Sequence, residues 1–390
     1  MKIIVLDRPA FGKQDIIEAF HALGIETTLY IHDDIQEAVS ETLEEDFANF
    51  AFGGEYDFVF SFNYFPSLSR AAKKAGLKYV SFVYDSPLLA LFSCTIIEPH
   101  NYVFIFDSAM YQRLADIGIP TVYYLPLCSN PDRNLHLTIS DAARKAFTSD
   151  ISFVGSLYNE EHNLLDRIRD MEPFTKGYLD SLMEAQMQVS GVNFVEDCLS
   201  KNILDEFQKK SPYLTQPGGT EPDSYIYANY FVNRKITSIE RIRLLSAISE
   251  KYPLKIFSKA NSSTIPKAAF PGTVDYYEQM PLVFQCSKIN LNITLRSIIN
   301  GIPLRAFDIM GNGGFLLTNF QSDLLNYFVP NEDFVYFESK DDLLTKVDYY
   351  LTHEKERKEI AANGLARVKA DHTYVHRAKL ILEVVMGESS

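Results

Sequence analysis

The segment GIPLRAFDIMGNGGFLLTN, residues 301–319, contains a helix, a turn and a strand in immediate succession. Apolar residues recur at helical spacing from Leu304 to Met310, which predicts a short amphipathic helix. Three apolar residues in a row, Phe315 to Leu317, are typical of a buried strand in a parallel sheet. Between the two lies a glycine-rich turn of Gly311, Gly313 and Gly314. This order is that of an α/β fold.

Strand-like and helix-like patterns alternate along the rest of the chain, which predicts parallel sheets with helices on their faces. Strands are expected at 2–6, 25–31, 58–62, 79–83, 102–106, 122–125, 150–154, 254–257, 287–293 and 334–337, and a further strand-like run covers 230–232. Helices are expected at 15–23, 67–75, 109–117, 238–250, 341–351, 354–369 and 374–386, with a long helical stretch at 160–207. We therefore predict an α/β chain with two doubly wound, Rossmann-like parallel sheets.

A boundary between two domains is expected at residues 129–141, where Asn, Pro, Asp and Arg occur without an apolar period. The predicted domains are residues 1–140 and residues 141–390. The helical pattern at about 160–210 is longer than a crossover needs and is predicted to be an insertion into the second domain; the last helix is a candidate to pack back on the first. Ligands of open α/β sheets bind beyond the carboxyl ends of the strands, so a cleft between the domains is the expected site.

The composition excludes several classes of protein. The 390 residues carry a formal net charge of −14, which argues against a nucleic acid as the main partner because such binding needs basic patches. No segment has the pattern of a signal peptide or a membrane span. The four cysteines are widely separated and are predicted to be reduced, which favours a cytoplasmic protein. No cluster of histidines or cysteines predicts a metal site.

Asp308 and Arg305 are the first candidate site residues. They lie three positions apart, so they share one face of the predicted helix. A carboxylate at that place could accept hydrogen bonds from a ribose diol, and a guanidinium could meet a diphosphate. The glycine turn, with Gly313 and Gly314, would let the backbone approach such a ligand closely. The same residues are equally compatible with a helix cap and an ion pair at the surface.

Further candidates follow predicted strands. Asp85 comes after the strand at 79–83 and could act as a general base or orient an acceptor hydroxyl, although Asp-Ser-Pro is also ordinary turn chemistry. Gly155 and Ser156 end the strand at 150–154 in the manner of a phosphate-binding turn, or of any tight turn.

Several motifs are missing, which narrows the chemistry. Neither G-x-x-x-x-G-K-[ST] nor G-x-S-x-G occurs, and no G-x-G-x-x-G follows the first strand. Phosphate-loop hydrolases, α/β-hydrolases and dinucleotide enzymes are therefore disfavoured. A D-x-D metal clamp is also absent, so positive side chains and helix N-termini must neutralise any bound diphosphate. The candidate cations are Arg305, Arg296, Lys288, Arg234 and Lys235, although each taken alone is more typical of a solvated surface charge. Asn290 and Asn292 are polar groups on one strand face.

Six blocks of sequence resemble a known family. They are FVYDSP (82–87), FIFDSAMYQRLADIGIPTVYYLPLCSNP (104–131), DISFVGSLY (150–158), SKINLNITL (287–295), RAFDIMGNGGFLLTN (305–319) and HTYVHRAKLIL (372–382). Through them the chain is similar, over nearly its whole length, to the CgeB-type (spore-maturation-like) glycosyltransferases of the GT-B superfamily. The resemblance implies two Rossmann-like domains facing an interdomain cleft, and transfer of a sugar from a nucleotide donor.

The resemblance also implies roles for individual residues. Related GT-B enzymes carry two glutamates eight positions apart, and the second usually binds the donor ribose. Asp308 matches the second glutamate, whereas Asn300 stands at the place of the first. By the same resemblance, Gly155 and Ser156 face the diphosphate, and Asp85 lines the acceptor side of the cleft.

The predicted function is a cytoplasmic, metal-independent hexosyltransferase that uses a nucleotide sugar, expected to be a UDP-sugar, and no cofactor. Arg305 would stabilise charge on the leaving diphosphate, and Asp85 would take the acceptor proton. Two alternatives stay open: a catalytically inactive nucleotide-sugar-binding regulator, which the Asn300 and Asp308 pair would suit, and a nucleotide-sugar epimerase. The sequence leaves open the sugar, the glycan or protein acceptor, inversion or retention, and the oligomeric state.

Overall fold

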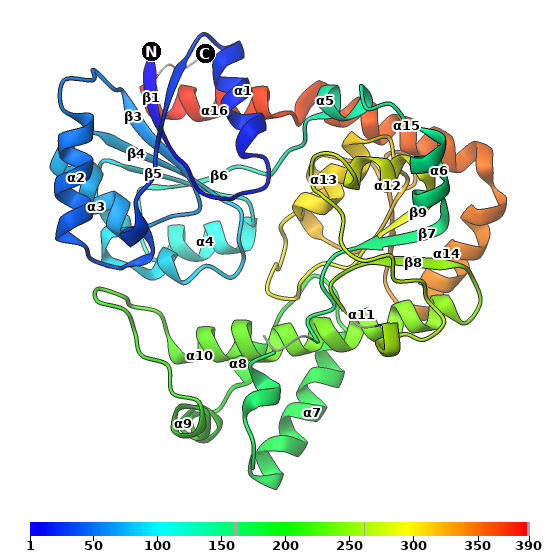
Figure 1. Cartoon of the computed structure of the whole chain (residues 1–390). Helices are drawn as coiled ribbons and strands as arrows, with labels where there is room; N and C mark the ends of the chain where they lie inside the picture. The colour runs from blue at the N-terminus through cyan, green and yellow to red at the C-terminus, as the bar shows by residue number, and fades with distance from the viewer. Residues whose placement is uncertain (160–162, 261, 388–390) are drawn as a thin grey trace. The chain divides into compact units, whose positions relative to one another are not determined.

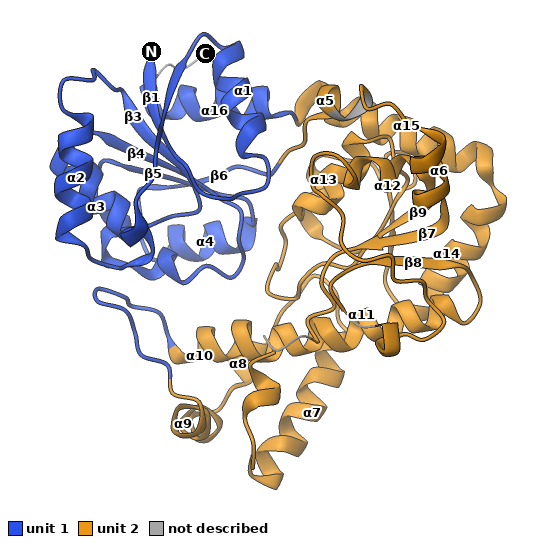
Figure 2. Ribbon diagram, viewed as in Figure 1, with its two compact units in different colours: residues 1–127, 213–222, 373–390 blue, residues 128–212, 223–372 orange. Residues whose placement is uncertain are grey.

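The computed structural model describes residues 1–159, 163–260 and 262–387 (Figure 1). The chain forms two compact units, coloured separately in Figure 2. Unit 1 contains Met1–Leu127, Tyr213–Pro222 and Thr373–Ser390, and unit 2 contains Cys128–Pro212 and Asp223–His372. The chain thus leaves unit 1 before the predicted linker at 129–141 and returns to it twice, once for a short arm and once for the last helix.

Unit 1 is built on a parallel sheet of six strands. They are β1 (Lys2–Leu6), β2 (Glu26–Tyr30), β3 (Phe58–Phe62), β4 (Lys78–Val83), β5 (Asn101–Ile105) and β6 (Val122–Tyr124), in the order β2-β1-β3-β4-β5-β6. Its helices are α1 (Lys13–Ala22), α2 (Glu41–Ala51), α3 (Pro66–Ala75), α4 (Ser108–Asp116) and α16 (Tyr374–Met386), with short 3₁₀ turns at Asp33–Gln36, Leu89–Phe92 and Cys94–Ile97. The predicted first sheet is confirmed, whereas α2 was not predicted.

The last helix belongs to unit 1 because specific contacts bind it there. The Arg377 guanidinium donates to the carbonyl of Pro126 and, at 3.0 Å, to that of Leu127. At the other end of α16, Lys78 Nζ donates to the carbonyl of Val385 at 2.6 Å. Helix α16 also packs against α1. These bonds satisfy backbone carbonyls that would otherwise be buried without a partner.

Unit 2 is built on a parallel sheet of five strands. They are β7 (Ser149–Val154), β8 (Leu254–Phe257), β9 (Ser287–Asn292), β10 (Leu316–Asn319) and β11 (Val335–Phe337), in the order β11-β10-β9-β7-β8. Its longer helices are α7 (Pro173–Met187), α9 (Lys201–Lys210), α11 (Asn233–Ser249), α13 (Leu304–Gly311), α14 (Lys340–Thr352) and α15 (Glu354–Asp371). The shorter ones are α5 (Pro131–Leu135), α6 (Asp141–Phe147), α8 (Val195–Cys198), α10 (Asp223–Ile226) and α12 (Met280–Cys286). The predicted second sheet is confirmed.

Both sheets reverse their strand order at one point. In unit 1 the second strand lies on one side of β1 and the third on the other; in unit 2, β8 and β9 flank β7 in the same way. The crossovers that leave the central strand therefore run in opposite directions, and a crevice opens beyond its carboxyl end. In unit 2 this switch point lies where β7 and β9 end, which is where open α/β sheets bind their ligands.

The run at 230–232 is not a strand, contrary to the prediction. Residues Tyr227–Val232 form a π-helical turn that joins α10 to α11. Aromatic side chains from this turn pack against Phe207 of α9: the ring of Tyr227 lies 5.1 Å and that of Phe231 6.2 Å from it. The apolar residues therefore pack between helices. A short apolar run occurs in buried helical segments as well as in buried strands, so the sequence pattern did not distinguish the two.

The glycine turn after α13 serves packing rather than ligand approach. A Cβ on Gly314 would lie 2.7 Å from Nδ2 of Asn290 and 3.1 Å from the carbonyl oxygen of Ile309. A Cβ on Gly311 would lie 2.6 Å from Oγ of Ser129. The turn leads into the amino end of β10, at the edge of the sheet opposite the switch point. The structure thus does not bring Gly313 and Gly314 to the expected ligand edge.

We predict that Gly314→Ala lowers the free energy of unfolding of the chain by about 1–3 kcal/mol, because the added methyl group overfills the contact between α13 and β9. Asn290 cannot swing away cheaply, since its amide accepts from Ser152 Oγ at 2.8 Å and donates to the Phe284 carbonyl at 3.1 Å. Urea denaturation followed by circular dichroism measures the change.

The matched control is Gly177→Ala. Gly177 lies inside α7, and a Cβ there meets nothing within 4 Å. This substitution should raise stability by about 0.5–1 kcal/mol, because alanine favours a helix interior over glycine. Equal effects of the two substitutions would contradict the close packing inferred for Gly314.

Candidate functional site

The turn after β7 lies at the switch point of unit 2. Gly155 N donates to the Phe257 carbonyl at 3.1 Å, which continues the pairing of β7 with β8. The Ser156 hydroxyl accepts from the Tyr158 amide at 2.9 Å and so closes a tight turn. A Cβ on Gly155 would lie 3.8 Å from Nη1 of Arg241. Glycine therefore keeps the space beside that guanidinium open.

Arg241 connects the ends of the two strands that flank the switch point. From α11 its Nη1 donates to the Ser156 carbonyl at 2.6 Å, and its Nε donates to the Ile293 carbonyl at 3.0 Å. The guanidinium lies 5.3 Å from the ring centre of Phe153 and 5.0 Å from that of Tyr158. Burial lowers the pKa of Arg241 from its usual value, and the charge of Arg305 lowers it further. A buried cation thus stands directly behind the β7 turn.

Sequence reasoning missed Arg241. It lies inside a predicted helix, four positions before Leu245 and seven before Ile248, so helical spacing places it on the apolar face, opposite Arg243. In the structure Arg241 is buried, whereas Arg243 is half exposed and pairs with Glu184. The bonds from Arg241 to the ends of β7 and β9 could not be read from that spacing.

Arg305 and Asp308 lie together on α13, as their spacing predicted. Arg305 Nη1 is 3.4 Å from Oδ2 of Asp308, and the Asp308 side chain is 3% exposed. Its other oxygen, Oδ1, accepts from the hydroxyl of Tyr276 at 3.1 Å. Arg305 also contacts the sulfur of Met280 and lies 5.7 Å from the ring centre of Phe284. The pair is a buried cluster between α12 and α13 and not an ion pair of the surface.

The connections between strands explain how these side chains reach the switch point. Helices α12 and α13 lead into β9 and β10, so their first turns lie near the carboxyl ends of the parallel strands. Helix α12 packs with α13, whereas α11 packs with α14. The right-handed crossover rule places α11 on the opposite face of the sheet. Arg305 and Arg241 therefore lie on opposite faces of the sheet, and the charge of Arg305 is one of the causes that lower the pKa of Arg241.

Three other predicted ligand residues form hydrogen bonds or ion pairs within the protein. Asn290 is fully buried, with its amide bonded to Ser152 and to the Phe284 carbonyl. The Asn292 amide donates to Thr294 Oγ1 at 3.0 Å and to Thr318 Oγ1 at 2.9 Å. Lys288 pairs with Asp150 at 2.6 Å, beside the amino ends of β9 and β7. The structure does not bring Lys288 or Asn290 to the carboxyl edge, because strand register fixes both earlier in β9.

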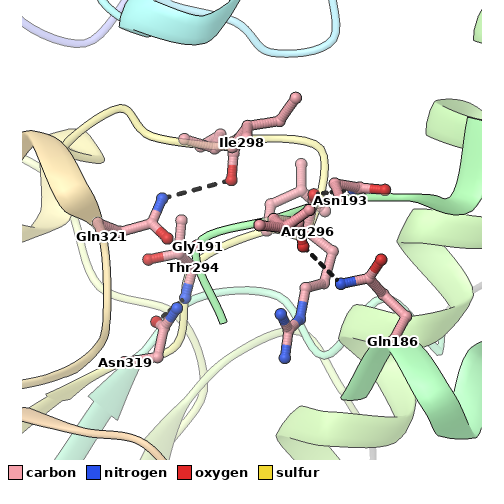
Figure 3. Close-up of a pocket in the computed structure, with 11 residues that line it drawn as sticks. Gln186, Gly191, Asn193, Thr294, Arg296, Ile298, Asn319 and Gln321 are labelled. Carbon is pink, nitrogen blue, oxygen red and sulfur yellow. Dashed lines mark hydrogen bonds between the residues drawn. The ribbon is translucent and has the colours of Figure 1, made fainter. Parts of the chain in front are cut away.

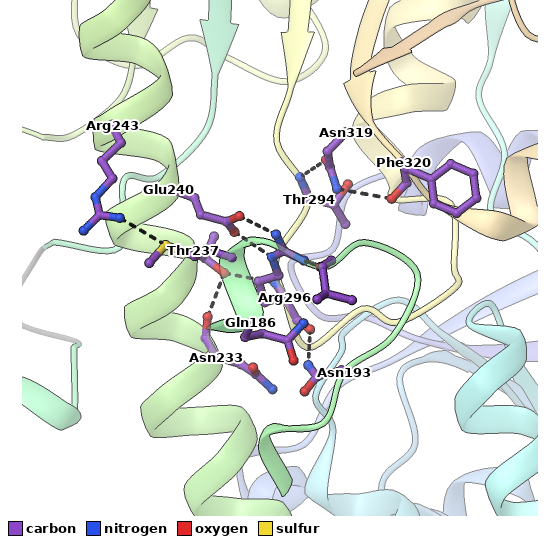
Figure 4. A network of polar contacts seen from close by, with 12 residues as sticks. Gln186, Asn193, Asn233, Thr237, Glu240, Arg243, Thr294, Arg296, Asn319 and Phe320 are labelled. Carbon is purple, nitrogen blue, oxygen red and sulfur yellow. Dashed lines mark hydrogen bonds and ion pairs between the residues drawn. The ribbon is translucent and has the colours of Figure 1, made fainter. Parts of the chain in front are cut away.

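Arg296 anchors the connection that leaves β9 (Figure 4). Its Nε donates to Oε2 of Glu240 at 2.7 Å, and its Nη1 donates to the Val189 carbonyl at 2.9 Å. Its own amide donates to Thr237 Oγ1 at 2.9 Å, and its carbonyl accepts from Asn193 Nδ2 at 2.7 Å. These bonds tie the β9 connection to α11 and to the loop after α7.

A small pocket lies beside this anchor (Figure 3). Gln321 Nε2 reaches across it to the carbonyls of Ile298 at 3.3 Å and Gly301 at 3.0 Å. Thr294 N donates to Oδ1 of Asn319 at 2.7 Å. The segment between β9 and α13, which contains Asn300, is therefore fixed by Asn319 at the end of β10 and by Gln321, which follows it. Two further cations proposed from the sequence have partners within unit 2. Arg234 lies over the ring of Tyr230, and Lys235 forms an ion pair with Asp166.

Asp85 lies at the carboxyl end of β4 in unit 1, and its carboxylate is exposed and oriented. Asn63, which follows β3, donates from Nδ2 to Oδ2 of Asp85 at 2.8 Å. The Asn63 side-chain oxygen accepts from the backbone amides of Tyr84 at 2.9 Å and Asp85 at 3.0 Å. Asn63 has a φ of 60°, a backbone conformation that asparagine tolerates better than most residues. Sequence reasoning missed Asn63, although an asparagine just after a strand is a usable signal.

Among the described residues, no helix has the length and apolar character that a membrane span requires. Within those same ranges, His, Cys, Asp and Glu side chains form no group of three or more that could hold a metal ion. The side chain of Asp107 accepts from the Ala109 amide at 3.1 Å and caps α4.

Comparisons with known proteins agree with this architecture. Residues 237–383 match a family model described as glycosyl transferase-like. No curated protein matches the sequence. A glycosyltransferase from Rickettsia africae is similar over 100% of this chain and 99% of its own, with a TM-score of 0.53 at 12% identity.

Two further solved structures have the same fold. Anabaena HepE in complex with UDP-glucose matches 99% of this chain and 100% of its own, with a TM-score of 0.53 and 10% identity. Sucrose-phosphate synthase from Thermosynechococcus elongatus matches 100% of both chains, with a TM-score of 0.51 and 11% identity. The chain therefore has two Rossmann-like parallel-sheet domains like those of GT-B glycosyltransferase structures.

We predict that Arg296→Ala lowers the free energy of unfolding by about 3–5 kcal/mol, because it leaves the carboxylate of Glu240 largely buried without its cation. The two side chains are only 16% and 13% exposed. Arg243→Ala is the matched control: its pair with Glu184 is 52% exposed on both sides, so the loss should stay within about 1 kcal/mol. Denaturation by urea measures both; equal losses would refute the anchoring role of Arg296.

Proposed function

We propose that the chain is a CgeB-type glycosyltransferase that moves a hexose from a UDP-sugar to an acceptor hydroxyl without a metal ion. The observation that carries this proposal is the buried guanidinium of Arg241, which is bonded to the ends of β7 and β9 at the switch point where open α/β sheets bind ligands. Arg305, paired with Asp308 on α13, is the second cation of unit 2. The glycosyl transferase-like family model covers the same region.

The two cations suit a diphosphate leaving group. As the bond between the anomeric carbon and the diphosphate stretches, negative charge grows on the phosphate oxygens. Arg305, with Arg241 behind the turn of Gly155 and Ser156, stabilises that charge in place of a metal ion.

The neighbouring carboxylate suits the nucleoside part of the donor. Asp308 is buried and ready to accept hydrogen bonds, because the hydroxyl of Tyr276 already donates to it. A ribose diol presents the same kind of donor and takes the place of that hydroxyl. The HepE structures are described with UDP and glucose and with UDP-glucose, which supports a UDP-hexose as the donor.

Unit 1 supplies the acceptor side in this proposal. Asn63 orients the exposed carboxylate of Asp85 at the end of β4, where it takes the proton of the attacking hydroxyl. The oxygen then attacks the anomeric carbon, the bond to the diphosphate breaks, and UDP leaves with the bonding electron pair. A cytoplasmic location is part of the proposal, and the wide spacing of the four cysteines along the chain supports it.

The proposal is tested with a panel of nucleotide sugars and no acceptor. We expect slow release of free hexose from a UDP-sugar, because water replaces the missing acceptor. Asp85→Asn should keep the UDP affinity of the wild type and lose most of the hydrolysis and transfer, by roughly 10²–10⁴-fold. Nucleotide binding without release from any donor would identify an inactive binding protein, and conversion of one UDP-sugar into its epimer would identify an epimerase.

The ribose assignment makes a separate prediction. Asp308→Asn should weaken UDP binding by about 1.5–3 kcal/mol, since the ribose hydroxyls lose a charged acceptor. The amide keeps the shape of the side chain and an oxygen for Tyr276, but it gives up the ion pair with Arg305, so the melting temperature should also fall. Isothermal titration calorimetry measures the affinity. Unchanged UDP affinity in Asp308→Asn would remove Asp308 from the donor site. So would an equal loss of affinity in Tyr276→Phe, which leaves Asp308 in place.

A further inference from the structure

A cavity lies in unit 1, and none of its lining residues belongs to the proposed donor or acceptor residues. It has a volume of about 260 Å³ and lies between α3 and the segment that leads into β5. One water needs only about 10–15 Å³ of such space, so the cavity has room for a small ligand and its hydration. Its lining residues are Glu44, Ser69, Arg70, Lys73, Lys74, Thr95, Glu98 and His100.

The charges around the cavity compensate one another, and Lys73 and Arg70 both help to lower the pKa of Glu98. Lys73 pairs with Glu98 at 2.7 Å, and Lys74 lies 3.6 Å from Glu45. Arg70 has a buried Nε for which the structure shows no hydrogen-bond partner among the described residues. A guanidinium keeps its charge inside a protein, and a buried donor without an acceptor costs stability. The cavity therefore presents one cation whose acceptor is missing.

A short arm covers part of this cation. Residues Tyr213–Pro222 belong to unit 1 although their neighbours on both sides belong to unit 2. The Cys94 amide donates to the Gly218 carbonyl at 2.7 Å, and the Thr220 amide donates to the Phe92 carbonyl at 2.9 Å. A Cβ on Gly218 would lie 2.9 Å from the Cys94 sulfur and 3.7 Å from Nη2 of Arg70. The arm thus lies directly against the guanidinium.

We propose that this cavity is a binding site for a phosphate group, held by the guanidinium of Arg70 and the ammonium of Lys73. The planar fork of arginine matches two oxygens of a phosphate, which satisfies the buried Nε. Lys73 is exposed enough to turn from Glu98 to the anion. Glu44 and Glu98 repel a ligand of higher charge, so a single phosphate group fits and a polyanion does not.

The site is separate from the proposed donor site. The donor residues belong to unit 2, whereas all the lining residues of this cavity belong to unit 1. His100 directly precedes β5, at the edge of the sheet opposite Asp85. Because Gly218 lies over Arg70, an anion bound there also stabilises the docked arm. Occupancy of the site thus affects a segment that the transfer reaction itself does not use.

Calorimetric titration of the full chain with inorganic phosphate at constant ionic strength tests the site. We expect saturable binding by the wild type and by Lys201→Gln, a control on the exposed face of α9. Arg70→Gln should weaken binding roughly tenfold or more, and Arg70→Lys, which keeps the charge without the fork, should also weaken it. Equal affinity in the wild type and both Arg70 variants, with their melting temperatures unchanged, would overturn the proposal.

Arg305→Gln separates this site from the donor site. Phosphate binding that survives Arg305→Gln and is lost in Arg70→Gln supports the cavity; the reverse result assigns the phosphate to the donor site and overturns the proposal. Titration with a hexose phosphate distinguishes the source of the group, since tighter Arg70-dependent binding of the ester identifies a phosphorylated metabolite. Amide hydrogen exchange gives an independent readout: phosphate should slow exchange at Cys94 and Thr220 in the wild type and not in Arg70→Gln.

Discussion

The bonds from Arg241 to the ends of β7 and β9 are the constraint on which the geometry of unit 2 depends. Parallel strands that diverge at a switch point leave carbonyl groups without ladder partners. Arg241 donates to two of these carbonyls, those of Ser156 and Ile293, and thereby fixes the turn after β7 against the connection after β9. Because the same guanidinium keeps its charge, the group that holds the two strand ends together also makes their crevice attractive to an anion.

The connection after β9 is also fixed by an arginine. Arg296 is bound to α11 through Glu240 and Thr237, and to the loop after α7 through Val189 and Asn193. Helix α11 therefore carries, within two turns, both the cation behind the switch point and the anchor of the loop that leads to α13. The loop after α7 thus packs against the connection after β9 through Val189 and Asn193.

The sequence predicted the features that depend on local spacing and missed those that depend on contacts through space. Strands of a parallel sheet are apolar on both faces, so most of them were recognisable as short apolar runs. Arg305 and Asp308 were paired correctly because three residues along a helix is a local distance. Arg241, Tyr276 and Asn63 were missed because each acts on a residue at least 20 positions away, which no periodic pattern records.

The glycine turn after α13 illustrates why one residue type supports two different explanations. A missing side chain lets either a ligand or another part of the protein come close, and spacing does not distinguish the two. Position in the sheet does: the turn enters β10 at its amino end, where Asn290 occupies the space beside Gly314. Gly155, by contrast, follows β7 at the carboxyl edge, where a Cβ would lie 3.4 Å from the ring of Phe153 and 3.8 Å from Nη1 of Arg241. A glycine is thus evidence for a ligand site only when it follows a strand, at the edge where parallel sheets bind their ligands.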